Sequence, residues 1–410
     1  MKYQHYFLMI VHCVFVITTC NAMENKRTSL KYVQTIKVIP KPLRVCCLTD
    51  DRVVIGNKNG CFLVDVIGDR IIQQINKFNY SESNNCSNPK DILGLRACLD
   101  LKVCQKRQKI ITYYDKTVEI YNGKTGKKEW SEIAKKPIKY IDFCSLNSTL
   151  FVCYGGTSCL GNGEQPDNTI TRCDYTNKEE CCRDLFLSNQ SCFLSYQNCV
   201  CVTVHPKEEK IFTVDTIGDA CFYAVKDAQV DEQIVVPGGC NGIYDCFYSP
   251  DGSCIAVTNC EFVAFVDSNK ESKKQKYPSF CFRDSYGLGG TIQFHPNSKV
   301  LGLLYLTRER GKDKARLIYW DIEMQQEIGR SSFETRAYDF GFSPDGKFVV
   351  VAKENECAVL SVPEEVVYNG YYRIEKLLWC LFVLKQFQKK WYIVKDVRQK
   401  CANILLHKFQ

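Results

Sequence analysis

Residue types that commonly perform catalysis are sparse in this sequence. It has five histidines, and two of them, His5 and His12, lie within the first 22 residues. His205 and His295 each precede a proline at equivalent places in a repeated pattern, which predicts turn residues rather than a catalytic pair. The sequence has no Gly-x-Ser-x-Gly elbow, phosphate-binding loop or His-Glu-x-x-His motif. We therefore assign no catalytic residue.

Carboxylates are the other residues that could form a site. Five aspartates fall near the ends of predicted strands, where Asp commonly closes turns, and a metal site needs several of them to converge. We assign no metal ligand among them. The glycine-rich run from Tyr286 to Gly290 has neither the preceding strand nor the following helix of a phosphate-binding loop, so we predict a plain loop and no cofactor. The five aspartates are Asp215, Asp219, Asp245, Asp267 and Asp339.

Cysteine is unusually frequent, with 26 residues, and two interpretations stay open. In an oxidising compartment some thiols would pair, above all in a cluster from Cys153 to Cys201. Alternatively, cysteines inside apolar strand-like runs act as small buried hydrophobic residues, which is the interpretation we favour. We predict no zinc site, because no Cys-x-x-Cys pair is followed by a second matching pair. The cluster consists of Cys153, Cys159, Cys173, Cys181, Cys182, Cys192, Cys199 and Cys201.

The first 22 residues have the layout of a cleavable signal peptide. Lys2 is followed by a short apolar run from Phe7 to Ile17, which is too short to span a bilayer, and small residues precede a cleavage point after Ala22. We therefore expect an exported protein, periplasmic or secreted. A lipid anchor on Cys20 is the less favoured alternative, because Thr19 is larger than the residue usual before a lipidated cysteine.

The net charge of +8 does not point to a nucleic-acid partner. Residues 364–410 carry +5 of it, and the remainder is nearly balanced, without a dense block of Lys and Arg. We predict that the chain does not bind nucleic acid.

A repeat of 44, 46 and 48 residues, measured between successive prolines, organises the chain. Pro250 and Pro344 lie in Ser-Pro-Asp-Gly turns between two apolar strands, and Pro206 and Pro296 lie in His-Pro turns with the same flanks. Proline presets φ for the first turn position, and Asp-Gly tolerates the bend that follows. These features are typical of hairpins in a propeller blade.

Three degenerate copies precede these four, near residues 45–56, 99–114 and 141–154, which gives seven units. A third apolar strand and a fourth, more polar strand follow most of the turns. The last unit lacks a fourth strand after Val362, whereas Tyr32 to Ile39 is an alternating strand with no repeat of its own. We predict that this N-terminal strand completes the last blade and closes the ring.

The repeats resemble those of the WD40 family. Tyr319-Trp320-Asp321-Ile322 is similar to the name-giving Trp-Asp dipeptide, and the Ser-Pro-Asp-Gly turns are similar to the hairpins of that family. The resemblance covers about Tyr32 to Pro363 and implies an all-β, seven-bladed propeller, which we place at residues 30–363.

Two segments depart from the repeat. Gly155 to Asn189 is a long insertion in the third unit, either a recognition loop or an excursion without a role. Residues 364–410 have apolar residues at helical spacing from Ile374 to Leu405, with lysines that argue against a membrane span. We predict a helical tail that packs on the propeller or, alternatively, offers a groove to a partner.

These observations favour a non-enzymatic scaffold. A rigid, monomeric ring offers large loop-lined faces to a protein partner that the sequence does not identify. The alternative is a propeller enzyme, a hydrolase or lyase, with its site at the mouth of the central channel. A cluster of carboxylates or histidines in that channel would favour the enzyme.

Overall fold

The computed structural model describes the backbone of the chain from Tyr32 to Val366 with gaps. The described residues are 32–37, 39, 42–57, 59–77, 100–114, 116–134, 138–144, 148–154, 170–174, 182–185, 199–215, 218–224, 230–236, 245–258, 262–268, 280–281, 291–309, 311–363 and 366. The proposed signal peptide, Cys20, the run from Tyr286 to Gly290 and the tail after Val366 lie outside them.

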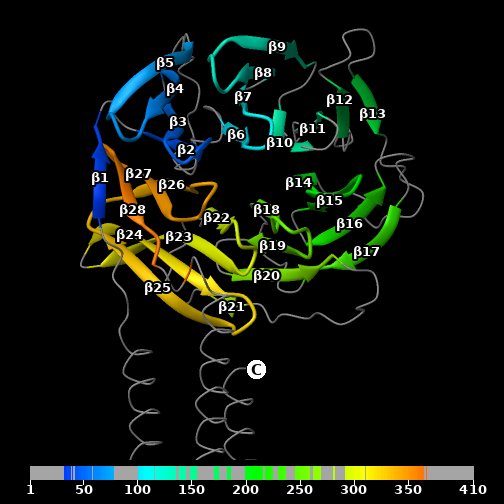
Figure 1. Ribbon diagram of the computed structural model, residues 1–410. Coiled ribbons are helices and arrows are strands. Elements are labelled where there is room, and N and C mark those ends of the chain that lie inside the picture. Colours follow the sequence, from blue (N-terminus) through cyan, green and yellow to red (C-terminus); the bar gives the residue numbers. More distant parts are fainter. Residues whose placement is uncertain are drawn as a thin grey trace, which may run out of the picture.

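Seven antiparallel sheets of four strands each surround a central axis (Figure 1). Blade 1 consists of β2 (Arg44–Cys47), β3 (Arg52–Asn57), β4 (Gly60–Asp65) and β5 (Arg70–Lys77). Blade 2 consists of β6 (Asp100–Cys104), β7 (Lys109–Tyr114), β8 (Thr117–Asn122) and β9 (Lys128–Ile133). Blade 3 consists of β10 (Ile138–Cys144), β11 (Thr149–Tyr154), β12 (Ile170–Asp174) and β13 (Cys182–Leu185).

The second half of the ring repeats the same strand order. Blade 4 consists of β14 (Cys199–Val204), β15 (Lys210–Asp215), β16 (Asp219–Ala224) and β17 (Val230–Val235). Blade 5 consists of β18 (Asp245–Tyr248), β19 (Cys254–Thr258), β20 (Phe262–Asp267) and β21 (Phe280–Cys281). Blade 6 consists of β22 (Thr291–Phe294), β23 (Val300–Glu309), β24 (Lys312–Asp321) and β25 (Gln326–Phe333). Blade 7 consists of β26 (Ala337–Phe342), β27 (Phe348–Lys353), β28 (Cys357–Ser361) and β1 (Tyr32–Ile36).

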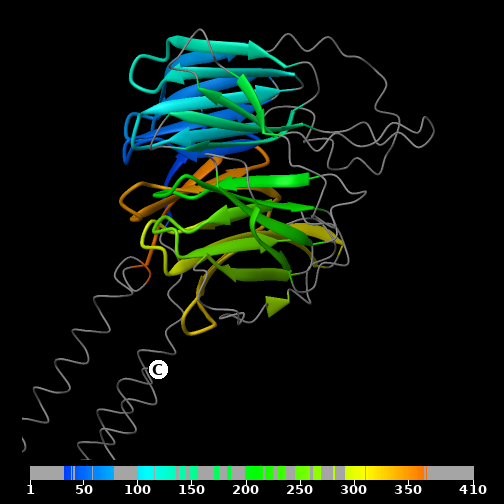
Figure 2. The ribbon, with the colours of Figure 1, turned by 90° about the vertical axis from the view of Figure 1, so that its right-hand side faces the viewer.

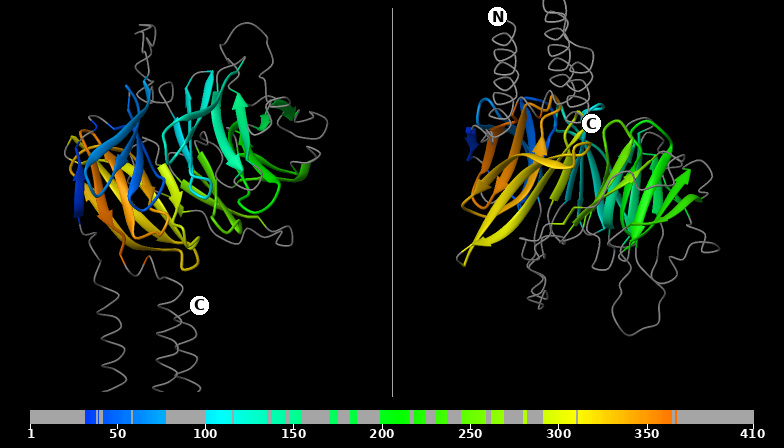
Figure 3. Two further views of the ribbon diagram at one scale, coloured as in Figure 1. Left: turned by 45° about the horizontal axis from the view of Figure 1, so that its top comes forward. Right: turned by 90° about the horizontal axis from the view of Figure 1, so that it is seen from below.

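The first strand closes the ring, as the sequence predicts. β1 pairs with β28 in antiparallel register, so that Tyr32 lies opposite Leu360 and Ile36 opposite Cys357. In Figures 1 and 3 this strand, in blue, lies beside the orange strands of the last sheet. Pairing the first and last strands of the propeller leaves the ring without a gap between its first and last blades.

Burial follows the position of a strand within its blade. Middle strands are buried on both faces because neighbouring blades cover them, as in β19, whose five residues are all buried. Outer strands alternate or are exposed, as in β9, which is the more polar for that reason. Seen from the side, the strands run between the two faces of the disc (Figure 2).

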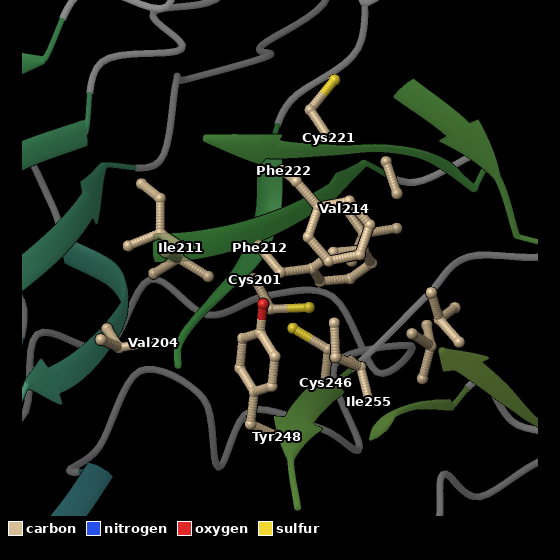
Figure 4. Close-up of a cluster of buried hydrophobic side chains, with 14 of the residues drawn as sticks. Cys201, Val204, Ile211, Phe212, Val214, Cys221, Phe222, Cys246, Tyr248 and Ile255 are labelled. Carbon is tan, nitrogen blue, oxygen red and sulfur yellow. The ribbon is translucent and has the colours of Figure 1, made fainter. Parts of the chain in front are cut away.

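Cysteines of several described strands are buried in the core, which is the packing that the interpretation we favour predicts for Cys201, Cys221 and Cys246. Cys201, Cys221 and Cys246 lie among aromatic and aliphatic side chains in one cluster of blades 3 to 5 (Figure 4). Their exposed fractions are at most 1%. Burial also raises the pKa of the Cys47 thiol to about 12, so that thiol stays protonated at neutral pH.

The prediction of an insertion from Gly155 to Asn189 is wrong in part. The segment supplies β12 and β13, the third and fourth strands of blade 3. Glycine and polar residues interrupt the alternation of the segment, so the pairing of β12 with β11 and of β13 with β12 fixes these strands more than their own sequence does.

Candidate binding site around the central channel

Side chains from three blades meet near the central axis of the ring. Lys102 comes from β6 of blade 2, Tyr140 from β10 of blade 3, and Asp245 and Phe247 from β18 of blade 5. Blades 2 and 5 are not neighbours in the ring, so contacts between their innermost strands lie across the axis. We call these four residues the channel cluster.

Hydrogen bonds and ring contacts connect the channel cluster. Lys102 Nζ donates to the Tyr140 hydroxyl at 3.0 Å, and that hydroxyl donates to Asp245 Oδ1 at 2.6 Å. The ammonium also lies 4.4 Å from the centre of the Phe247 ring and 4.7 Å from that of Tyr140. Cations favour the faces of aromatic rings, and charged partners strengthen hydrogen bonds. The cluster thus forms a continuous bridge from Lys102 to Asp245.

Burial governs the electrostatics at this place. It raises the pKa of Tyr140, with the Asp245 charge acting in the same direction, so the hydroxyl remains a donor at neutral pH. The pKa of Asp142 is raised chiefly by burial, and the Lys102 ammonium opposes that rise. The Lys102 ammonium thus acts on the Asp142 carboxyl group and is linked to that of Asp245 through the Tyr140 hydroxyl.

Polar side chains on the innermost strands also tie neighbouring blades together. Asp142 Oδ2 accepts from Val204 N at 2.7 Å and from the Thr203 hydroxyl at 3.1 Å. In the next blades, Thr203 Oγ1 accepts from Tyr248 N at 3.3 Å, and Gln293 Oε1 accepts from Phe342 N at 3.1 Å. Side chains at this one position of the repeat thus accept hydrogen bonds from the backbone of the following blade. They connect neighbouring blades.

The five aspartates considered from sequence do not converge. Asp245 belongs to the channel cluster, whereas Asp339 accepts from Val45 N at 3.0 Å and ties blade 7 to blade 1. Asp215 closes the turn before β16 by accepting from Asp219 N at 2.9 Å, and Asp267 ends β20. Within the part of the chain that the structure describes, no group of three or more His, Cys, Asp and Glu side chains could hold a metal ion.

His205 and His295 are turn residues, as their repeat position predicts. His205 Nδ1 accepts from Glu208 N at 2.8 Å, so its proton is on Nε2, which lies 3.2 Å from Gly252 O of the next blade. In the same way, His295 Nε2 lies 2.9 Å from Gly346 O of blade 7. Burial lowers the pKa of both imidazoles, which keeps them neutral.

Two further bonds continue this chain of turns. Asp251 N donates to Ser298 Oγ at 2.9 Å, and Asp345 N donates to Asp50 Oδ1 at 3.1 Å. Together with the two histidines they link the turns of blades 4, 5, 6, 7 and 1 in order. This face of the ring is therefore held by its own turns.

Lys102, Tyr140 and Phe247 escape sequence reasoning because no local motif includes them. Lys102 and Phe247 do occupy equivalent positions, because each is the third residue of the innermost strand of its blade. Aligning the strands by their ladder register, rather than by turn motif, is the signal that could have found them.

Comparisons with known proteins bear on the fold. No family model and no curated protein matches the sequence. The β-propeller domain of Cps50 (Swd1) from Myceliophteria thermophila is similar in structure, with a TM-score of 0.59 at 9% identity over 82% of this chain and 100% of that domain. The chain has the fold of a seven-bladed WD40-type propeller. In all, 1480 chains of known structure match, and a likeness shared so widely identifies a fold rather than an activity.

None of the helical segments among the described residues has the length and apolar character needed to cross a membrane.

Proposed function

We propose that this chain is a non-enzymatic, protein-binding scaffold. The observation that carries the proposal is that the polar side chains near the axis form hydrogen bonds within the protein. Lys102, Tyr140 and Asp245 bond to one another, and Asp142 bonds to the backbone of blade 4. Groups bound in this way hold the ring rigid, and a rigid ring is suited to presenting loops and turns to a partner.

A test compares binding with turnover on the same protein. The full chain is used to capture candidates, and each purified candidate is then titrated directly against it. We expect saturable one-to-one binding that persists in Asp142→Asn and Asp245→Asn variants whose folding has been verified. Turnover of a hydrolase or lyase substrate that either substitution abolishes would instead establish the enzyme alternative.

A parallel titration separates the propeller from its tail. A chain that ends at residue 369 keeps Val366 and lacks most of the predicted helical segment. We expect the shortened chain to bind the same partner as the full chain. Loss of binding in the shortened chain alone would place recognition in the tail.

We further propose that the protein is exported from the cytoplasm, with cleavage after Ala22. The support is the order of charges, apolar residues and small residues in the first 22 positions. N-terminal sequencing of the protein from its natural source should begin at Met23. An intact Met1 would contradict export, and a lipid found on Cys20 would replace secretion with anchoring.

A further inference from the structure

One pair of cysteines lies directly opposite across a strand ladder. Cys173 of β12 is the register partner of Cys182 of β13, in the outer half of blade 3. Each other cysteine in the described ladders is opposite a residue of another type. The cluster of buried side chains that includes Cys173 contains no other described cysteine. Cys144, Cys153 and Cys201 belong to a different cluster.

Directly opposed residues satisfy the main geometric demand of a disulfide. Their Cα atoms lie about 4.5–5.5 Å apart in an antiparallel pair, and a disulfide requires about 4.4–6.8 Å. Opposed residues also face the same side of the sheet. The register therefore selects Cys182 over its neighbour Cys181, which precedes the first residue of β13.

We infer that Cys173 and Cys182 form a disulfide in the exported protein. This inference rests on the proposed export, since only an oxidising compartment maintains such a bond. The two thiols lose two protons and two electrons to a disulfide oxidant by thiol–disulfide exchange. The oxidant becomes a dithiol, and the new bond joins the two sulfur atoms.

The bond would act where blade 3 is held by few ladder pairs. β13 has four residues, and its register with β12 comprises four pairs. A covalent link between the last two strands holds β13 in place independently of those hydrogen bonds. The bond would therefore fix the outer edge of this blade in the mature protein.

Peptide mapping without reduction tests the pairing. The exported full chain is alkylated, then digested after lysine and arginine, which separates residues 173–178 from residues 179–183. We expect these two peptides to be joined, with a mass two hydrogens below the sum of the two peptides with Cys181 alkylated, and with fragments that locate the link at Cys182. A link at Cys181, or alkylated Cys173 in exported protein, would overturn the inference.

Matched variants separate the pairing from the fold. Cys181→Ser should keep the linked peptides, and Cys182→Ser should lose them. Reduction should lower the Tm of the wild type and of Cys181→Ser and leave that of Cys182→Ser unchanged. Because mapping of the wild type needs no substitution, the test holds even if a variant fails to fold.

A separate arm distinguishes failure of export from failure of pairing. If the natural protein retains Met1, the purified folded chain is incubated with oxidised glutathione and mapped again. Formation of the link then supports the pairing while export is wrong. Absence of the link under these conditions would rule the pairing out.

Discussion

The Nε2 atom of His295 lies 2.9 Å from the carbonyl oxygen of Gly346, across the boundary between blades 6 and 7. Gly346 has a φ of 74°, in the left-handed region that favours glycine. A Cβ atom at this residue would overlap the imidazole of His295. The turn therefore requires glycine both for its backbone conformation and for the approach of the next blade.

Gly346→Ala should accordingly lower the free energy of unfolding by at least about 2 kcal/mol, from left-handed strain together with crowding of the imidazole. Urea denaturation measures the change. Gly311→Ala is the matched control, because Gly311 has a φ of 77° with no atom within 4 Å of an added Cβ. It should lose only about 1–2 kcal/mol. Equal losses in the two variants would show that contact with His295 contributes nothing.

Acidification should destabilise the protein through His205 and His295. Burial is the main cause that lowers the pKa of both folded imidazoles, so the unfolded chain takes up protons first as pH falls. The stabilisation from the two neutral imidazoles should be fully present above about pH 6.5. Below that pH the free energy of unfolding should decline by up to about 1.4 kcal/mol per pH unit for each imidazole.

The carboxylate of Asp345 acts lower on the pH scale. Hydrogen bonds from Ser343 and Lys347 help to lower the pKa of Asp345, so its contribution is lost only below about pH 4. The contribution of the imidazoles is isolated by comparing unfolding curves between pH 5 and 7 with those of a variant that carries both His205→Gln and His295→Gln. If the slope of unfolding free energy against pH is the same in that variant as in the wild type, the two histidines are not the cause of the decline.

Tyr140→Phe should uncouple the channel cluster. The substitution leaves Lys102 without its hydroxyl acceptor and Asp245 without its hydroxyl donor, at a cost of about 1.5–3 kcal/mol in unfolding free energy. A double-mutant cycle with Asp245→Asn should give a coupling energy of about 0.5–3 kcal/mol. Strict additivity would mean that the hydrogen bond of 2.6 Å does not contribute to stability.

Val366 extends the core beyond the last strand. Its side chain has no exposed area, and its carbonyl oxygen accepts from Asn297 Nδ2 at 2.8 Å. Val366→Ala should lower unfolding free energy by about 1–3 kcal/mol, measured by denaturant titration. Val235, with 71% of its area exposed, supplies the control, and Val235→Ala should change stability by less than about 0.5 kcal/mol. Similar effects at the two sites would contradict a packing role for Val366.

The number of blades is predictable from the sequence because turn chemistry marks four of them and pairs of apolar strands mark the other three. The closure is predictable because the last unit lacks a fourth strand and the N-terminal strand has no repeat of its own. Pro250 and Pro344 mark hairpins whatever the rest of the chain does. The outer strands of blade 3 are not predictable in this way, because β12 depends on pairing with β11, and β13 depends on pairing with β12. The same holds for Lys102 and Phe247, whose contact spans two blades that are far apart in sequence.

The pairing of β1 with β28 also sets the order in which the molecule can be completed. The partner of the first strand is among the last residues of the propeller to be synthesised, so the seventh sheet stays unfinished until nearly the whole ring has left the ribosome. Earlier blades can fold as neighbouring pairs. Joining β1 to β28, in contrast, must overcome the conformational entropy of closing a loop that contains nearly the whole propeller. Until that step, the exposed edge of β28 is a surface that another chain could occupy.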